Sequence, residues 1–304
     1  MAEALVINII AAEPGARIHE AARKITREFS DAGLVEEPVW LSPDKACDIG
    51  VQIAWPELAV AIPRGVLHMG EGLDVNILAA ANRRKKLLVA DMDSTIVGCE
   101  CVDELAALAR LKPQVAAITD RAMNGDIPFE EALRERVALL KGLSLDALER
   151  TYRDRVRLNP GAVTLVSTMK AHGARTCLVS GGFTFFTERV AKAAGFDGHQ
   201  ANVLLDDGSR LTGAVREPIL GREAKLNALR NEMAALGISA ADALAVGDGA
   251  NDLAMIEHAG LGVAYHAKPV LADAADAGIR YGDLTALLFL QGYRADEFVS
   301  SAPA

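Results

Sequence analysis

The sequence predicts an α/β protein: a doubly wound (Rossmann-like) parallel sheet core that carries an inserted helical cap and follows a small βαββαβ ferredoxin-like unit. Two patterns predict this fold. Short apolar runs alternate with helical segments on both sides of a long block that is helical throughout, which is typical of a parallel sheet with an insertion. Three of the apolar runs also break abruptly into carboxylate, hydroxyl or glycine residues, as strands do where a parallel sheet binds its ligand.

Residues 1–80 are expected to form the small unit. Its elements follow the order strand, helix, strand, strand, helix, strand, with strands at 4–11, 39–41, 49–55 and 74–79 and helices at 18–29 and 57–67. The basic polar segment 82–86 comes next and is typical of a hinge, so the boundary of the unit is expected there.

Residues 86–97 and 159–290 are expected to form the sheet core, and residues 98–158 the helical cap. The core strands are predicted at 87–90, 175–179, 243–246 and 260–264. Helices that end at Gly195 and Gly237 separate the later strands.

Three local patterns refine this core. Pro160 suits the first position of a helix that stops at Gly173. The string Asp206-Asp207-Gly208-Ser209 between apolar residues predicts a hairpin. Residues 293–304 are expected to be a frayed tail.

The charge balance of the chain excludes one class of partner. Acidic residues outnumber basic ones by 41 to 32, which gives a formal charge of −9. We expect no nucleic-acid binding, because nonspecific binding to nucleic acid requires a basic surface. An anionic ligand would need a locally positive pocket.

The sequence indicates neither a membrane protein nor an oxidising compartment. No apolar stretch approaches the roughly 20 residues that cross a bilayer, and no basic residue precedes Arg17 as a secretory signal would require. The four cysteines, Cys47, Cys99, Cys101 and Cys177, are expected to be reduced thiols. Cys99-x-Cys101 lacks the second Cys or His pair of a zinc site. We therefore expect a cytoplasmic protein.

The polar residues that end three core strands are the candidate site. Asp91 and Asp93 follow the first strand, Ser180-Gly181-Gly182 the second, and Gly247-Asp248-Gly249-Ala250-Asn251-Asp252 the third. Because an open parallel sheet binds ligands at the carboxyl ends of its strands, these residues are expected to converge on one crevice.

Asp91-x-Asp93 places two carboxylates on roughly the same side of a strand end. Their repulsion would raise the pKa of one of them, which suits a nucleophile beside a proton donor and acceptor. A divalent cation would relieve the repulsion with Asp248 as a third ligand, and oxygen ligands favour Mg²⁺. The alternative is that Asp91 and Asp93 only cap the helix that follows.

Ser180-Gly181-Gly182 and Lys225 are candidate anion ligands. Glycines before a helix let backbone N–H groups approach an anion, although Ser180 could simply cap that helix. Lys225 lies in the first turns of a predicted helix, where a cation opposes the helix dipole. An anion held there would explain this placement, whereas a pair with Glu223 or a solvated side chain are the alternatives.

Arg136 lies on the apolar stripe of the cap segment 129–140. Its guanidinium group either extends past the stripe to water or points into a pocket, where it would hold a carboxylate through two hydrogen bonds. Met123 and Phe129 would then be apolar walls of that pocket, or else ordinary core residues.

In combination and order, the strings DMDST, SGGF and GDGANDLAM, together with Lys225, resemble the motifs of the haloacid dehalogenase superfamily of aspartate-dependent phosphohydrolases. The resemblance covers residues 86–282. Glu100 in VGCE and the segment MNGDIPFEEALRERVALLKGL are similar to the substrate-recognition cap of the phosphoserine phosphatase family within it. No motif position departs from the family pattern.

The resemblance implies a catalytic cycle with Mg²⁺. Asp91 would be the nucleophile that becomes aspartyl-phosphate, and Asp93 would protonate the leaving serine oxygen and then activate water. Mg²⁺ would bind Asp91, the Asp93 backbone carbonyl and Asp248. Asp252 would be a partner of the metal-bound water or of Lys225.

The resemblance also implies how the substrate, O-phosphoserine, is bound. Four residues would hold the phosphoryl group or orient the attacking water: Ser180, Gly181, Lys225 and Asn251. Glu100 would bind the serine ammonium group and Arg136 its carboxylate. Three residues would shape the pocket: Met123, Phe129 and Gly182.

Residues 1–80 resemble the ACT-like domain that precedes the phosphatase in some bacterial enzymes, although they carry no distinctive ligand motif. The resemblance implies that this unit binds serine or forms a homodimer. A purely structural role is the alternative.

The resemblance as a whole predicts a Mg-dependent hydrolase of O-phosphoserine that catalyses the last step of serine biosynthesis. The same chemistry on another small phosphorylated metabolite, or transfer to an alcohol acceptor, is the alternative enzyme function. A dehalogenase would have no use for Asp93 or for a metal cluster. The intact set Asp91, Asp93, Lys225 and Asp248 argues against a catalytically silent amino-acid sensor.

Overall fold

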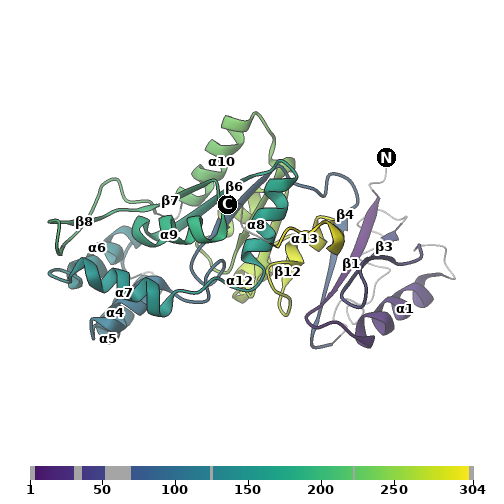
Figure 1. Ribbon diagram of the computed structural model, residues 1–304, viewed down its shortest axis with the longest axis horizontal. Coiled ribbons are helices and arrows are strands. Elements are labelled where there is room, and N and C mark those ends of the chain that lie inside the picture. Colours follow the sequence, from purple (N-terminus) through teal and green to yellow (C-terminus); the bar gives the residue numbers. More distant parts are fainter. Residues whose placement is uncertain (1–3, 31–35, 52–69, 124–125, 222, 301–304) are drawn as a thin grey trace.

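The computed structural model describes residues 4–30, 36–51, 70–123, 126–221 and 223–300 (Figure 1). Two larger sheets organise the chain, one with four strands and one with six. Within the described ranges, every helix falls short of the length or the apolarity that a membrane-spanning segment needs.

The four-stranded sheet is antiparallel and has the order β2-β3-β1-β4. Its strands are β1 (Leu5–Ala11), β2 (Val39–Ser42), β3 (Ala46–Val51) and β4 (Leu73–Ala79), and the helix α1 (Ala16–Ser30) lies between β1 and β2 in the chain. The strands and the first helix of the predicted small unit are therefore present. The helix predicted at 57–67, like the end of the strand predicted at 49–55, lies outside the described residues.

Both faces of the four-stranded sheet are buried. Successive side chains of β1 point to opposite faces, so Ile7 and Ile9 pack with α1 whereas Val6 and Ile10 join the hydrophobic core of the larger sheet. The short helix α13 (Ala286–Leu290) lies next to β1 on that second face (Figure 1). The N-terminal unit and the larger sheet thus share one continuous apolar core.

The six-stranded sheet is parallel and has the order β12-β11-β10-β5-β6-β7. Its strands are β5 (Leu87–Asp91), β6 (Arg175–Phe183), β7 (Gly198–Asn202), β10 (Ala243–Gly247), β11 (Leu261–Tyr265) and β12 (Ala277–Ile279). The strand β5 lies between β10 and β6, so the three strands that carry the predicted site residues are neighbours.

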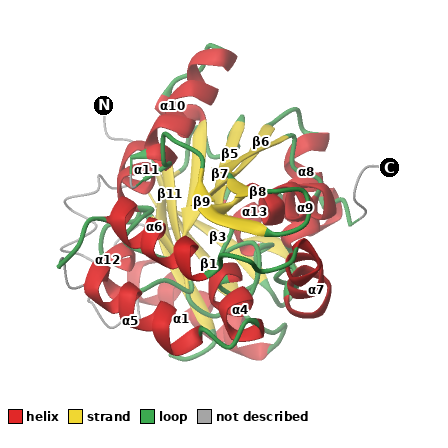
Figure 2. Cartoon of the chain, turned by 90° about the vertical axis from the view of Figure 1, so that its left-hand side faces the viewer, coloured by secondary structure: helices red, strands yellow, loops and turns green. Residues whose placement is uncertain are grey.

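Helices cover both faces of this sheet (Figure 2). One face packs against α10 (Ala224–Leu236), α11 (Leu253–His258) and α12 (Pro269–Ala272). The other packs against α8 (Ala162–Ala171), α9 (Thr184–Ala194) and α13. Two short 3₁₀ turns, at Ala240–Asp242 and Ala295–Glu297, complete this part. The doubly wound core that the sequence predicts is confirmed.

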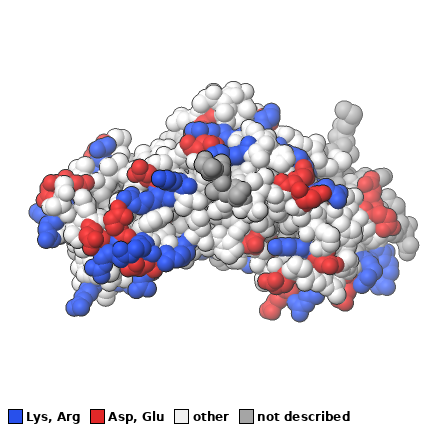
Figure 3. Space-filling view, in the orientation of Figure 1, with Lys and Arg blue, Asp and Glu red and all other residues white. Residues whose placement is uncertain are grey.

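The region inserted between β5 and α8 is helical, as predicted. Its helices are α4 (Cys101–Leu108), α5 (Lys112–Met123), α6 (Phe129–Leu139) and α7 (Leu145–Arg155). They gather at the end of the molecule opposite the four-stranded sheet (Figure 1). On the face drawn in Figure 3, acidic and basic side chains are interspersed over these helices.

A hairpin from the core is bonded to this cap. Its strands are β8 (Leu204–Asp206) and β9 (Leu211–Val215), at the predicted turn. The Gly142 N–H donates to the Leu211 carbonyl at 2.8 Å, and the Leu145 N–H donates to the Ser209 carbonyl at 3.0 Å. The hairpin is thus tied to the loop between α6 and α7.

The start of α8 differs from the prediction. Its first residue is Ala162, so the prediction that Pro160 holds this position is wrong. Gly161 precedes the helix with φ at 83°, in the left-handed region. A Cβ atom at Gly161 would lie 2.6 Å from the backbone nitrogen of Thr285. The close approach of these two segments therefore requires glycine and delays the helix.

The predicted frayed tail is wrong for residues 293–300. The ring of Phe298 packs on Phe289, with 5.0 Å between ring centroids. The Val299 N–H donates to Thr168 Oγ1 at 2.9 Å. An aromatic side chain and a backbone bond to α8 hold this part of the chain on the core.

The basic segment 82–86, expected to be a hinge, is held by partners on both sides. Arg83 forms an ion pair with Asp48 of β3. Arg84 lies 2.7 Å from Glu297 in the C-terminal 3₁₀ turn. Arg83 and Arg84 are therefore paired with carboxylates far away in the sequence.

Candidate active site

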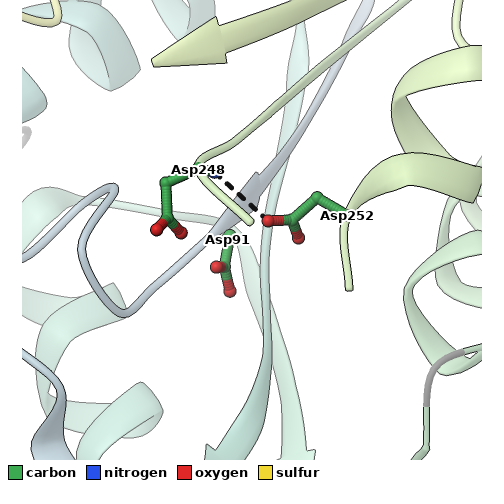
Figure 4. Close-up of side chains that lie close together, drawn as sticks. All are labelled: Asp91, Asp248 and Asp252. Atoms are coloured by element: carbon green, nitrogen blue, oxygen red, sulfur yellow. Dashed lines mark hydrogen bonds between the residues drawn. The ribbon is translucent and has the colours of Figure 1, made fainter. Parts of the chain in front are cut away.

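The strand ends that carry the predicted residues meet at the carboxyl edge of the six-stranded sheet. Asp91 is the last residue of β5, Gly247 the last of β10, and Ser180 lies in β6. The strand β5 pairs with both of the others. Figure 4 shows Asp91, Asp248 and Asp252 side by side, and each offers a carboxylate oxygen within 4.8 Å of the other two. The structure therefore brings these predicted residues together.

Lys225 lies in the first turn of α10 and is only 3% exposed. Its Nζ is 2.7 Å from Asp91 Oδ1 and 2.5 Å from Asp252 Oδ1. Burial alone would lower the pKa of Lys225, but the two carboxylates outweigh burial and raise that pKa. Lys225 is therefore a buried, charged partner of the aspartates, and the alternative of a solvated surface lysine is wrong.

The carboxylates of the site outnumber this lysine. Burial raises the pKa of Asp91 well above its ordinary value, and the charge of Asp252 raises it further, while Lys225 acts in the opposite direction. Burial and Asp252 also raise the pKa of Asp248. With Asp93, four carboxylates lie around the buried Lys225, and the exposed Lys268 also acts on Asp248. This excess of negative charge and the all-oxygen donor set fit a hard divalent cation such as Mg²⁺.

Both oxygens of the buried Asp252 already accept hydrogen bonds. Oδ1 faces Lys225, and Oδ2 accepts the N–H groups of Asp248 at 3.2 Å and Gly249 at 3.1 Å; Figure 4 draws the first of these two bonds. A Cβ atom at Gly247 would collide with the Asp252 side chain, so glycine allows the aspartate to fold back under the loop. This arrangement suits Asp252 for holding Lys225 and the Asp248 loop better than for binding a cation directly.

Asp93 links the core to the cap. Its Oδ1 accepts the N–H of Cys101, the first residue of α4, at 2.8 Å, and its Oδ2 accepts the Ser180 hydroxyl at 2.9 Å. Asp93 therefore caps the first turn of α4 as the alternative states, but it does not only do so, because it also contacts Ser180. Asp91 accepts the N–H of Met92 at 2.8 Å and lies against Lys225. Burial raises the pKa of Asp93 in spite of these bonds, which favours a carboxyl group that holds a proton.

The Ser180-Gly181-Gly182 stretch continues strand β6, which runs to Phe183. Phe183 is the N-cap residue of α9, so the alternative that Ser180 caps this helix is wrong. The Ser180 Oγ instead accepts the Gly182 N–H at 2.8 Å. A Cβ atom at Gly182 would lie 3.2 Å from Asp93 Oδ2 and 3.0 Å from Ser180 Oγ, so glycine gives the backbone room beside the carboxyl group.

Glu100 lies at the start of α4, at the border of core and cap. Its Oε1 accepts the Ser94 hydroxyl at 2.8 Å. The loss of water around its carboxylate raises the pKa of Glu100 to about 7, although much of the residue remains exposed, and the charges of Asp93 and Asp248 act in the same direction. In the part of the chain that the structure describes, Glu100 has no basic residue at ion-pair distance.

Arg136 is half-buried in α6. Its Nε donates to the Ala132 carbonyl at 3.3 Å. Burial lowers the pKa of Arg136, whereas the negative charges of Asp103 and Glu100 raise it. Among the described residues, no carboxylate lies at ion-pair distance from Arg136. The Arg136 charge is thus partly desolvated, has no ion-pair partner among the described residues, and lies near enough to Glu100 for that charge to act on it.

For the remaining predicted residues, Phe129, Gly181, Asn251 and Met123, the structure gives fewer contacts. Phe129 begins α6, and a Cβ atom at Gly181 would lie 3.5 Å from its Cζ, so the cap reaches the strand end of β6 here. Asn251 is exposed in the loop that carries Asp248. Met123 ends α5, but its side chain lies outside the described residues.

Two groups of the site do not stand out in the sequence: the Ser94 hydroxyl, which bonds to Glu100, and the Cys101 backbone N–H, which bonds to Asp93. A hydroxyl residue directly after Asp93 is the available signal for Ser94. The Cys101 contact depends on where α4 begins, which local periodicity does not fix.

The chain is similar to known phosphatases and hydrolases of one family. Residues 88–257 match the haloacid dehalogenase-like hydrolase family. A phosphoserine phosphatase from Polaromonas sp. (strain JS666) is 50% identical over 230 residues, which cover 73% of this chain and 98% of that protein. A solved HAD family hydrolase from Salmonella enterica subsp. enterica serovar Typhi has a TM-score of 0.81 at 29% identity, with 94% of this chain and 98% of that chain covered. A phospho-aspartyl intermediate analogue of phosphoserine phosphatase has a TM-score of 0.62 at 39% identity, with 67% and 98% covered.

Proposed function

This chain belongs to the haloacid dehalogenase-like hydrolase family and is a phosphatase, and from that premise we propose that it hydrolyses O-phosphoserine to serine and phosphate through an aspartyl-phosphate on Asp91. One observation carries the choice of substrate. Glu100 lies near enough to Asp93 and Asp248 for their charges to act on it, and Arg136 lies near enough to Glu100 for the Glu100 charge to act on it. Their charges have opposite signs, and neither has an ion-pair partner among the described residues. Phosphoserine has an ammonium group, a carboxylate and a phosphate. Glu100 complements the first, Arg136 the second and Lys225 of the cluster the third.

Asp91 and Asp93 would carry the two chemical steps. A carboxylate oxygen of Asp91 would bond to phosphorus while the bond from phosphorus to the serine oxygen breaks. Asp93 would give its proton to that leaving oxygen, and its raised pKa favours this role. Asp93 would then accept a proton from water as the water attacks the phosphorus, which releases phosphate and regenerates Asp91.

The phosphoryl oxygens would be held by Lys225, by the Ser180 hydroxyl and by the Gly181 N–H. Ser180 and Gly181 belong to β6, and Lys225 reaches Asp91 at the end of β5 from the first turn of α10. Positioning and charge stabilisation are most of what phosphoryl transfer needs from a protein.

Three groups would hold Mg²⁺: the carboxylates of Asp91 and Asp248 and the backbone carbonyl of Asp93. The ion, when bound, supplies positive charge that allows a phosphate dianion to approach the Asp91 carboxylate. Asp252 would keep Lys225 in place, and Asn251 would orient the phosphate or the attacking water.

The cap would select the amino acid. Glu100 would accept the ammonium group, and Arg136 would bind the carboxylate through its two-nitrogen face. Met123, Phe129 and Gly182 would shape the pocket between them. Closure of the cap over this pocket would exclude bulk water from the reaction.

We propose the same division of the chain as the sequence predicts: residues 1–80 as an ACT-like unit, 86–97 and 159–290 as the core, and 98–158 as the cap. A homodimer formed through the first unit would use the edge strand β2, where Val39 is 56% exposed, because both faces of that sheet are packed. The proposed setting is the cytoplasm and the last step of serine biosynthesis.

A phosphate-release assay tests the proposal. The panel comprises phosphoserine, phosphothreonine, phosphotyrosine and a small aryl phosphate, each with Mg²⁺ and with a chelator. We expect kcat/KM for phosphoserine to exceed the others by about 100-fold or more, and the chelator to stop release. Equal rates on phosphoserine and on unrelated monoesters would contradict the substrate, and release in the presence of chelator would contradict the cofactor.

A further inference from the structure

Asp74 of β4 is a buried carboxylate, 4% exposed, that belongs to the four-stranded sheet and not to the aspartate cluster. It accepts backbone N–H groups from three successive residues of the loop after β12: Arg280 at 2.8 Å, Tyr281 at 3.3 Å and Gly282 at 2.9 Å. Its neighbour on the same face, Asn76, accepts the Gly278 N–H at 2.8 Å. The edge of the four-stranded sheet therefore binds the edge of the six-stranded sheet through side chains.

The loop that Asp74 holds, residues 280–285, packs on the start of α8. The Leu284 N–H donates to the Pro160 carbonyl at 3.1 Å. The left-handed Gly161 leaves no room between the two segments, because a Cβ atom there would lie 2.6 Å from the Thr285 nitrogen. A shift of this loop would therefore move residues 160–161.

Residues 157–159 are the return linker from the cap, and they pair with the outgoing linker at 96–98. The Asn159 N–H donates to the Ile96 carbonyl at 2.8 Å, and the Gly98 N–H donates to the Arg157 carbonyl at 3.2 Å. The Asn159 side chain donates to the Thr95 carbonyl at 2.8 Å. The paired linkers thus connect residues 160–161 to the segment between Asp93 and Glu100.

A second series of hydrogen bonds connects the 280–285 loop to the loop that carries Asp248. His266 Nε2 lies 2.9 Å from the Gly282 carbonyl. The Lys268 N–H donates to the Asp248 carbonyl at 3.0 Å. The 280–285 loop therefore supports both the cap linkers and the loop that carries one of the clustered aspartates.

We propose that Asp74 is a positioning residue for the phosphatase site: by fixing the 280–285 loop it sets the placement of the two cap linkers and of the Asp248 loop. The proposal rests on the site described under the proposed function. A remote residue can have such an effect, because a displacement of about 1 Å at reacting groups is enough to lower rates strongly. The N-terminal unit then acts on catalysis through one carboxylate.

Arg83 provides a matched control for Asp74. It also joins the N-terminal sheet to the core, through an ion pair with Asp48 and bonds of 2.9 Å to the carbonyls of Phe289 and Leu290. These partners lie at the far end of α13, away from the 280–285 loop. Arg83→Ala therefore weakens the same interface without releasing the loop.

The test compares Asp74→Ala, Asp74→Asn and Arg83→Ala by amide hydrogen exchange and by kinetics with phosphoserine and a small aryl phosphate. For Asp74→Ala we expect exchange in peptides 94–99 and 157–161 to rise about tenfold, and kcat/KM for phosphoserine to fall about tenfold, more than for the aryl phosphate. Asp74→Asn, which keeps one acceptor oxygen, should lie between. Arg83→Ala should keep linker exchange and kcat/KM within about twofold of the starting protein.

Two results would overturn the proposal. One is faster exchange confined to residues 280–282 in Asp74→Ala with unchanged linkers and rates. The other is an equal kinetic loss in Arg83→Ala, which would make the effect general to the interface. If Asp74→Ala does not fold, Asp74→Asn decides by the same criteria. Linker exchange is measured without substrate, so it decides even if phosphoserine proves not to be hydrolysed.

Discussion

The sheet side of the site (Asp91, Asp248, Asp252 and Lys225) and the cap side (Glu100 and Arg136) differ in how their charges are paired. At the sheet edge, Lys225 contacts two aspartates and the third faces the same cluster, so the groups are bonded to one another. On the cap, Glu100 and Arg136 each have only a neutral hydrogen-bond partner among the described residues. The sheet side is thus organised by the fold, which suits a group present in every phosphate monoester. On the cap side, a bound ligand would have to supply the opposite charges.

The largest expected effect is on the sheet side, for Asp91→Asn. A carboxamide does not attack phosphorus, so kcat for phosphoserine should fall by about 10⁴-fold or more. Lys225 keeps Asp252 as a partner, so the melting temperature should change little. Initial rates and a thermal melt check both statements. Activity retained in this variant would remove Asp91 as the nucleophile.

Lys225→Met tests whether the sheet side is balanced by that one cation. Its removal leaves buried carboxylates without a partner, which should lower the free energy of unfolding by about 3–5 kcal/mol in chelator. Mg²⁺ should restore more stability to this variant than to the starting protein. Denaturant titrations measure both effects. Lys24→Ala, at an exposed lysine, is the control and should change stability by less than about 0.5 kcal/mol; an equal loss in the two variants would contradict the comparison.

Arg136→Ala tests the cap side. It removes the group proposed to bind the substrate carboxylate, so kcat/KM for phosphoserine should fall about 100-fold. An aryl phosphate has no carboxylate, and its kcat/KM should fall only about threefold. Steady-state kinetics on both substrates decide, since equal losses would show that Arg136 acts on the site in general.

The smallest effect concerns Glu100 and pH. Its pKa is raised to about 7, so Glu100 is mostly protonated below that pH and ionised above it. Only the ionised form attracts an ammonium group, so kcat/KM for phosphoserine should fall as the pH decreases through this range, and bound Mg²⁺ should shift the fall to lower pH. Glu100→Gln should lower kcat/KM about tenfold and remove that limb. If kcat/KM for an aryl phosphate fell in the same way at low pH in the starting protein and in Glu100→Gln, Glu100 would be excluded as the origin of that fall.

Much of the sheet side could be predicted from the sequence. A parallel sheet brings the ends of its strands together, so runs that end in Asp91, Ser180 and Asp248 mark one place. Lys225 stood out because a cation at a helix start needs a partner. In both cases local sequence and a general rule of topology are sufficient.

The contacts between distant segments could not be predicted in this way. Arg83 and Arg84 look like part of a solvated hinge until Asp48 and Glu297 are placed beside them. Asp74 alternates with apolar residues as any half-exposed strand residue does, and its partners are about 200 residues away. Periodicity describes an element and its nearest neighbours, so it does not reveal these partners.

The hairpin formed by β8 and β9 has a consequence for access to the reaction centre. The main chain of the hairpin is bonded to the loop between α6 and α7. The cap helices can therefore move away from the core only if the hairpin moves with them or these bonds break. A free amino acid needs only a narrow gap, such as a parting of Phe129 from Gly181. These main-chain bonds therefore restrict how far the inserted helices can move away from the carboxyl edge of the sheet.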